Sequence, residues 1–325
     1  MVCILITGAG GFLGKRLTRA LAEAGSLARG EVREKISQIT LVDRVSVEAK
    51  YRSDIAFETL VGDLGDETFV EALCHRNFHS VFHLAAVLPL EAERDPGNSY
   101  RTNVGALQRV MECISGAPRL VFTSSLAVFG GELPERVDDS VVQRPATTYG
   151  VQKSISELLI ADYTRHGRID GRTLRLPIVL IRPGFVGPSP SVADRVASIL
   201  REPLRGRDVI APLAPDTHTP LASVGSVVKA LIQVHDMPSA ELPHHRAMNL
   251  PALTVSVAEM VEALAKYASD RTIGRVQYKA DRRLQAIVTG WPTYFVSEAA
   301  TRLGLKPDSG LDSIINDYLT HDTGD

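Results

Sequence analysis

Short apolar runs alternate with longer helical patterns through the first half of the chain, and this rhythm limits the possible folds more than any other feature. The apolar runs cover residues 3–7, 39–42, 58–61, 80–84, 119–124 and 174–179; the helical patterns cover residues 13–23, 68–76, 96–114 and 148–164. Strands joined through helices become parallel neighbours with right-handed connections. The pattern therefore predicts an α/β fold with a doubly wound parallel sheet. In residues 25–37 we expect an extra turn of helix.

The alternation stops near residue 180. Residues 182–190 are rich in proline and glycine, and later helical patterns cover residues 191–204, 224–235, 256–268 and 311–321, with one apolar run at 246–250. These segments cannot complete another repeat of strand, helix and strand. We therefore expect a first domain of residues 1–180, to which residues 220–240 return. Residues 181–219 and 241–325 should form a smaller, discontinuous substrate-binding lobe.

The composition argues against several classes of partner. A chain of 325 residues with a formal net charge of −2 has no strong field to attract nucleic acid or an anionic membrane. The opening residues lack a signal-peptide pattern and no apolar run reaches about 18 residues, so we expect a cytoplasmic protein that acts on a small molecule. Cys3, Cys74 and Cys113 are odd in number and far apart, which predicts reduced thiols and no metal site.

A glycine-rich turn follows the first apolar run directly and opens the first helical pattern. Gly8 can make the tight turn, Gly11 can let the backbone approach a pyrophosphate, and Gly14 can let the helix pack closely on the strand. Phe12 and Leu13 begin the helix, whose free N–H groups and partial positive charge suit phosphate oxygens. The spacing and the context predict a dinucleotide site.

Acidic residues follow the second and third apolar runs. A carboxylate at Asp43 can accept hydrogen bonds from an adenosine ribose and repels a 2′-phosphate, which favours NAD over NADP. The neighbouring Arg44 could pair with that phosphate instead and permit NADP. Asp63 and Leu64 are candidates for the adenine contact, and Asp63 could equally be a helix N-cap.

A hydroxyl, a phenol and an amine, which together could take a proton from an alcohol, occur in the middle of the chain. Tyr149 and Lys153 are four residues apart, so on a helix they share one face. A nearby ammonium favours the phenolate and makes tyrosine a usable proton acceptor. Upstream, Thr123, Ser124 and Ser125 close an apolar strand at the edge where a parallel sheet meets its ligands.

With these motifs in this order, the first 190 residues resemble an extended short-chain dehydrogenase/reductase, the Rossmann-fold family that includes nucleotide-sugar epimerases and dehydratases. The resemblance implies that Ser125 is the catalytic hydroxyl, Tyr149 the general base and Lys153 the ligand of the nicotinamide ribose. It also implies that Asn103 supports the lysine, often through water. The remaining cofactor contacts that it implies are Leu84, Ala85, Ala86, Thr123 and Pro177.

The second half resembles a sugar-acid branch of the same family, the D-erythronate dehydrogenases. The likeness rests on residues 174–177, 181–184, 201–204, 249–255 and 290–292. It implies a small sugar acid as substrate, and the guanidinium of Arg182 could hold its carboxylate or could form an interdomain ion pair. Residues 185–194 depart from the branch pattern, which leaves the particular acid open.

Three functions follow from these features. The leading hypothesis is an oxidation of a secondary alcohol of the sugar acid, at C2, with NAD as the acceptor. The alternatives are a nucleotide-sugar epimerase or dehydratase with tightly bound NAD, and a non-catalytic NAD sensor. Sensors typically lose the tyrosine or the lysine, and both are present here. The subunit count is open, a homodimer included.

Overall fold

A computed structural model describes every residue except 30–31, 50, 52–53, 182–190 and 322–325. The chain forms two compact units, which are described separately. The first comprises Met1–Val128, Pro145–Arg175 and Val228–Met248; the second comprises Phe129–Arg144, Leu176–Val227 and Asn249–Asp325. Residues 129–144 therefore fall in the second unit, although the strand and helix rhythm had placed them in the first domain.

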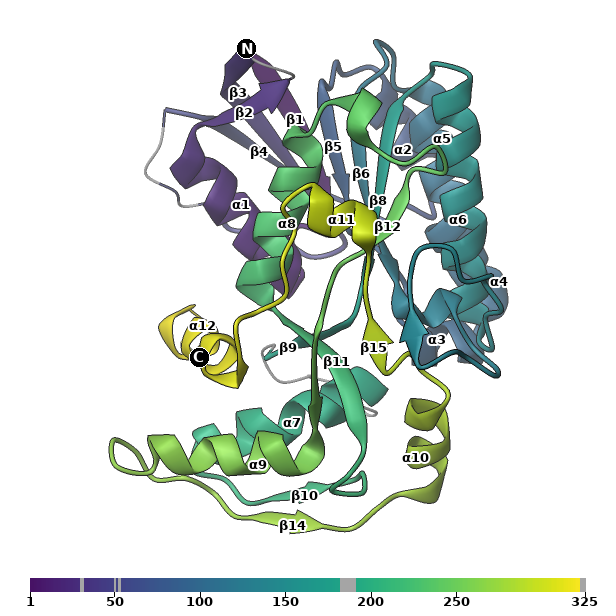
Figure 1. Ribbon diagram of the computed structural model, residues 1–325. Coiled ribbons are helices and arrows are strands. Elements are labelled where there is room, and N and C mark those ends of the chain that lie inside the picture. Colours follow the sequence, from purple (N-terminus) through teal and green to yellow (C-terminus); the bar gives the residue numbers. More distant parts are fainter. Residues whose placement is uncertain (30–31, 50, 52–53, 182–190, 322–325) are drawn as a thin grey trace. The chain divides into compact units, whose positions relative to one another are not determined.

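The first unit is built on one large sheet (Figure 1). Its strands lie in the order β12-β8-β6-β5-β1-β3-β2, and β4 pairs with β3 as well. Pairs β1/β3, β1/β5, β3/β4 and β5/β6 are parallel, so the predicted doubly wound parallel sheet is confirmed. The strands are β1 (Val2–Thr7), β2 (Ser26–Arg29), β3 (Val32–Asp43), β4 (Ala56–Val61), β5 (Ser80–His83), β6 (Arg119–Ser125), β8 (Asp170–Leu176) and β12 (Ala247–Asn249).

Within residues 25–37, residues 26–29 and 32–37 form strands rather than the expected turn of helix. Gly25 has a left-handed φ of 64° and ends the preceding helix. The chain then enters β2, which pairs with the start of β3 in antiparallel register from Ser26↔Lys35 to Arg29↔Val32. Cross-strand pairing at the edge of the sheet overrides a local sequence that is too polar to show a clear strand pattern.

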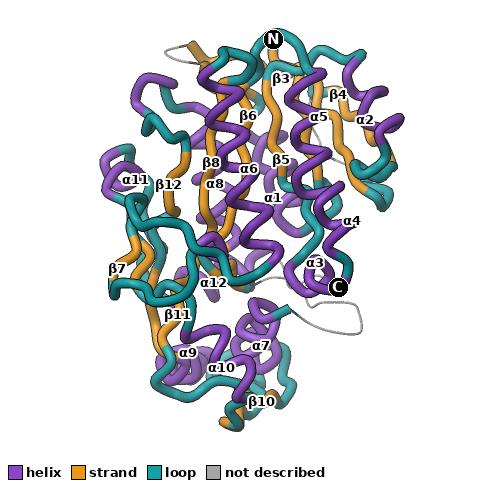
Figure 2. Tube along the Cα trace, turned by 90° about the vertical axis from the view of Figure 1, so that its right-hand side faces the viewer, coloured by secondary structure: helices purple, strands orange, loops and turns teal. Residues whose placement is uncertain are grey.

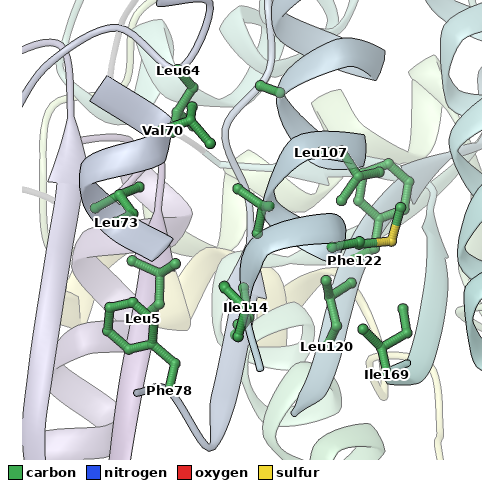
Figure 3. Packing of buried hydrophobic residues seen from close by; sticks show 14 of the residues in the cluster. Leu5, Leu64, Val70, Leu73, Phe78, Leu107, Ile114, Leu120, Phe122 and Ile169 are labelled. Carbon is green, nitrogen blue, oxygen red and sulfur yellow. The ribbon is translucent and has the colours of Figure 1, made fainter. Parts of the chain in front are cut away.

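Helices cover both faces of this sheet (Figures 1 and 2). Helices α2 (Glu67–Cys74), α5 (Ala106–Cys113) and α6 (Thr148–Arg165) lie on one face, and α1 (Phe12–Ala24) and α8 (Val224–Asp236) lie on the other. Figure 3 shows the core under the first group, where strand residues Leu5 and Leu120 meet Leu73 and Leu107. Full burial of each such side chain stabilises the fold by about 1.5–3 kcal/mol.

Two short helices lead into α5. Helix α3 (Pro89–Arg94) ends at Asp95, and α4 (Pro96–Tyr100) then continues without a break through a five-residue π-helix, Arg101–Gly105, into α5. Single π-helical turns are rare and frequently lie at functional sites.

The described residues of the second unit form three small sheets, in the orders β13-β11-β9, β10-β14 and β15-β7. The apolar run 174–179 is not one strand, because Pro177 separates β8 from β9, which pairs with β11. The other strands are β7 (Arg136–Val137), β9 (Ile178–Leu180), β10 (Val209–Ala211), β11 (His218–Ser223), β13 (Leu253–Ser256), β14 (Val276–Tyr278) and β15 (Tyr294–Phe295). The helices are α7 (Val192–Leu204), α9 (Val257–Leu264), α10 (Arg282–Thr289), α11 (Glu298–Arg302) and α12 (Leu311–His321). Within the described residues, no helix is both long enough and apolar enough to cross a membrane.

The cysteines differ from the sequence prediction in one respect. Cys3 is free, but Cys113 is disulfide-bonded, so the prediction of reduced thiols is wrong for Cys113. The side chain of Cys74 lies outside the described set. Cys113 is the last residue of α5, and the spacing of cysteines along a sequence does not show which of them form disulfides.

Candidate active site

The glycine-rich turn has the geometry that a pyrophosphate site needs. Gly8 follows β1 with φ of 71°, and a Cβ on Gly14 would lie 2.3 Å from the carbonyl oxygen of Gly8. Gly11 is the N-cap of α1, is exposed, and makes no side-chain cap bond. The first N–H groups of a helix have no partner within it, and together with the partial positive charge of the helix start they suit phosphate oxygens. These residues fit the phosphates of a dinucleotide.

The residues after β5 lie beside this turn. The backbone N–H of Leu84 donates to the carbonyl of Thr7 over 3.1 Å, and that of Ala85 donates to Thr7 Oγ1 over 3.3 Å. Strands β1 and β5 are the parallel neighbours at which the strand order reverses, where open α/β sheets bind their ligands. The structure therefore brings Leu84, Ala85 and Ala86 to the same edge as the glycine turn.

Asp43 ends β3 and faces the glycine turn. Its Oδ2 accepts a hydrogen bond of 2.8 Å from the backbone N–H of Gly10, and its Oδ1 accepts one of 3.3 Å from Val45. Each carboxylate oxygen can accept a second hydrogen bond, so the group is still suited to a ribose hydroxyl. The side chain of Arg44 is exposed.

The turn after β4 resolves one of the sequence alternatives. Asp63 is exposed, and its Oδ1 accepts a 2.8 Å hydrogen bond from the N–H of Gly65. The N-cap of α2 is Asp66, whose carboxylate accepts from Thr68, so the N-cap interpretation of Asp63 was wrong. Leu64 packs in the core (Figure 3), and its adenine contact stays a prediction.

Helix α6 brings Tyr149 to the end of β6. Its N-cap Thr147 accepts a hydrogen bond from the N–H of Gly150. A Cβ on Gly150 would lie 2.1 Å from the carbonyl oxygen of Ala127, so only glycine permits this approach. Ser125 is the last residue of β6, and its Oγ accepts a 3.1 Å hydrogen bond from the N–H of Ala127. Tyr149 and Ser125 are thus carried by segments in direct contact.

Lys153 is buried beside Tyr149 and the end of β6. Its side chain is 3% exposed, and Nζ donates a 2.7 Å hydrogen bond to the carbonyl oxygen of Thr123. Nζ also lies 4.3 Å from the ring centroid of Phe122 and 5.5 Å from that of Tyr149. Burial lowers the pKa of Lys153 to about 7, while the negative charge of Glu157 opposes this decrease. The structure therefore joins Thr123, Tyr149 and Lys153 in one site.

Asn103 is hydrogen-bonded to α6 through Gln152 and not through Lys153. It lies in the π-helix, where its Oδ1 accepts from the N–H of Val87 over 2.7 Å. Its Nδ2 donates to the carbonyl of Val87 and, over 2.6 Å, to Oε1 of Gln152, which precedes Lys153. The water-mediated support of the lysine stays a prediction.

Sequence reasoning missed a polar stripe on the buried face of α6. Gln152, Ser156 and Glu157 are all less than 5% exposed. Glu157 forms a buried ion pair with Arg175 of β8. Polar residues in a helix usually face solvent. The available signal was that Ser156 follows Gln152, and Glu157 follows Lys153, by four residues, which puts the members of each pair on one face of the helix.

His83 is a second buried group at the end of β5. Its Nδ1 lies 3.1 Å from Thr7 Oγ1, and its Nε2 has no hydrogen-bond partner among the described residues. Burial, followed by repulsion from Lys153, lowers the pKa of His83 to about 3, so the imidazole is neutral at physiological pH.

Two predicted residues are not joined to this site. Arg182 lies outside the described residues. Pro177 is buried in the second unit, between β8 and β9. Their proposed contacts with substrate and cofactor stay predictions.

Comparisons with known proteins identify a family and several similar chains. Residues 4–250 match the model of the NAD dependent epimerase/dehydratase family. The D-erythronate dehydrogenase of Cupriavidus necator is 37% identical over 319 residues, which are 97% of each chain. The D-erythronate dehydrogenase of Haemophilus influenzae is 36% identical over 322 residues, or 98% of this chain and 99% of that one.

A solved structure is similar as well. That of a nucleoside-diphosphate-sugar epimerase from Agrobacterium tumefaciens has a TM-score of 0.91 and 32% sequence identity, covering 99% of this chain and 94% of that one. These likenesses confirm both resemblances found in the sequence. This chain belongs to the NAD dependent epimerase/dehydratase family.

Proposed function

We propose that the protein is an NAD-dependent dehydrogenase that oxidises a secondary alcohol of a small sugar acid, D-erythronate or a close analogue, to the 2-keto acid. The observation that carries this proposal is the site at the end of β6, where Lys153 is buried against the Thr123 carbonyl with Nζ 5.5 Å from the ring centroid of Tyr149. The names of the two relatives from Cupriavidus necator and Haemophilus influenzae support the sugar-acid substrate.

The side chains divide the proton chemistry between them. Tyr149, on the first turn of α6, would accept the proton of the substrate hydroxyl through its Oη, and Ser125 Oγ, at the end of β6, would hold the same oxygen. The Lys153 ammonium, when charged, favours the phenolate form of Tyr149. As the proton leaves the oxygen and a hydride leaves the carbinol carbon, the C–O single bond becomes a carbonyl.

The glycine turn, Asp43, the segment after β5 and Lys153 would hold the cofactor. Bound NAD would supply the hydride acceptor at its nicotinamide ring. The carboxylate of Asp43, fixed by the N–H of Gly10, favours a free ribose 2′-hydroxyl over a 2′-phosphate. We therefore expect kcat/KM to be higher with NAD than with NADP. Equal kcat/KM values with the two cofactors would contradict the proposed contact of Asp43 with the ribose.

A panel of four- to six-carbon aldonates tests the substrate class. The purified protein is incubated with NAD and each acid, and NADH is measured by its absorbance. We expect turnover with at least one aldonate and none with matched neutral polyols. Better turnover of the polyols would overturn the sugar-acid assignment, and with it the proposed carboxylate contact of Arg182.

The second candidate is a nucleotide-sugar epimerase, which the similarity to the Agrobacterium tumefaciens structure favours. An epimerase would retain its cofactor and release no NADH. A nucleotide sugar that changes configuration without net reduction of added NAD would support this candidate against the dehydrogenase.

A further inference from the structure

Glu157 lies behind the proposed catalytic residues in a fully polar buried cluster. It is one helical turn after Lys153 on α6, and its side chain is 4% exposed. Arg175, also 4% exposed, donates from Nε to both carboxylate oxygens over 3.0 Å and from Nη2 to Oε2 over 2.8 Å. Bonds from a planar guanidinium to both oxygens hold the carboxylate in one orientation.

The hydroxyl of Ser124 donates to Oε1 of this carboxylate. Ser124 is 2% exposed and stands between two residues of the site, Thr123 and Ser125. Side chains alternate between the two faces of a strand, so a bond to Ser124 fixes the strand end and leaves the Ser125 hydroxyl available.

Helix α6 therefore holds the end of β6 at two points. Lys153 donates to the carbonyl of Thr123, and one turn later Glu157 accepts from Ser124. These bonds set the distance between the strand that carries Ser125 and the helix that carries Tyr149. A catalytic group displaced by about 1 Å can lose about a hundredfold in rate.

We propose that Glu157 is a positioning residue, which fixes Ser125 relative to Tyr149 through its hydrogen bond to Ser124. The role rests on the proposed dehydrogenase function, in which Ser125 and Tyr149 share the substrate oxygen. Glu157 itself does not touch substrate, and Arg175 serves to orient its carboxylate.

The test separates the hydrogen bond from the charge. Replacing Glu157 alone would leave the Arg175 guanidinium buried without this carboxylate. Arg175 is therefore replaced by Met in every variant that changes Glu157. The double variant Glu157→Met with Arg175→Met, called Met/Met below, deletes the acceptor of the Ser124 hydrogen bond. The double variant Glu157→Gln with Arg175→Met, called Gln/Met below, keeps a neutral acceptor in its place. Both double variants lack the negative charge of Glu157, so any electrostatic effect on Lys153 is the same in the two. Ser124→Ala deletes the donor, and Thr164→Val deletes a partly buried hydroxyl further along α6 as the matched control.

We expect kcat to fall about tenfold or more in the Met/Met and Ser124→Ala variants, with KM changed less than about twofold. The Gln/Met variant should recover most of kcat, and Thr164→Val should keep it. Equal kcat in the Met/Met and Gln/Met variants, or the same loss in Thr164→Val, would overturn the proposal. If Met/Met does not fold, Ser124→Ala compared with Thr164→Val decides.

Hydrogen exchange gives a readout that needs no substrate. The amides of residues 124–127 should exchange faster in the Met/Met and Ser124→Ala variants than in Gln/Met or Thr164→Val. Exchange that is the same in all four variants would also overturn the proposal. If the wild-type protein oxidises no aldonate, the proposed function fails, and this comparison still decides whether Glu157 holds the strand.

Discussion

Tyr149 and Lys153 are one helical turn apart at the start of α6, and Lys153 is held by the carbonyl of Thr123. Replacing Tyr149 by Phe keeps the ring and removes only the proton acceptor. We therefore expect kcat to fall by roughly 10²–10⁴, while the affinity for NAD, measured by titration, stays within a few-fold. A Tyr149→Phe enzyme that keeps most of its kcat would show that another group takes the proton.

At the scale of single residues, sequence motifs identified the proposed catalytic residues but not the buried groups packed behind them. Tyr149 and Lys153 were identifiable because their chemistry and spacing are unusual in combination. Glu157 and Arg175 were not, because a charged residue in a helix or strand normally faces water. Their burial depends on which strand lies opposite, and local sequence carries little information about that.

At the scale of elements, two glycines let backbone segments approach each other closely. A Cβ added to Gly150 would lie 2.1 Å from the carbonyl oxygen of Ala127, and one added to Gly14 would lie 2.3 Å from the carbonyl oxygen of Gly8. Gly150→Ala should push α6 away from the end of β6 and lower kcat at least tenfold with little change in NAD affinity. Gly14→Ala should instead weaken NAD binding at least tenfold.

Steady-state kinetics and NAD titration of the two alanine variants check this contrast. A loss of NAD affinity in Gly150→Ala as large as that in Gly14→Ala would contradict the separate roles of the two contacts. Thermal unfolding of both variants shows whether either loss reflects a general destabilisation.

Long, strongly patterned elements were predicted, and short or paired ones were not. The strand at Val2–Thr7 and the helix at Thr148–Arg165 have clear apolar runs or helical spacing. The β2 strand forms because β3 offers it an edge, and the two-residue strand β15 has too few residues for any period. The run through Pro177 was read as one strand because both halves are apolar, although proline lacks the N–H that a central strand needs.

At the scale of the whole molecule, buried histidines should make stability depend on pH. Burial lowers the pKa of His83 to about 3 and lowers that of His235 as well. The His83 imidazole stays neutral in the folded chain, whereas a histidine in the unfolded chain binds a proton near pH 6.5. The free energy of unfolding should therefore be highest above pH 6.5 and fall below it, with His83 contributing roughly 1.4 kcal/mol per pH unit and His235 acting in the same direction.

Urea unfolding at pH 7.5, 6.0 and 5.0 measures this slope. His83→Asn should reduce the slope by roughly 1.4 kcal/mol per pH unit, because one proton fewer distinguishes the two states. His245→Asn, which changes an exposed side chain, should leave it as in the wild type. A slope that His83→Asn does not alter would mean that other groups cause the acid sensitivity.

The central claim is that the site at the end of β6 removes a hydride from C2 of a small sugar acid and delivers it to NAD. Incubation with NAD and D-erythronate deuterated at C2 tests it directly, since nuclear magnetic resonance of the reduced cofactor shows whether deuterium has reached C4 of the nicotinamide. We predict one deuterium per NADH formed by the wild-type protein and almost no product from Tyr149→Phe. Unlabelled NADH, or no NADH with any C2-deuterated aldonate, would contradict the claim.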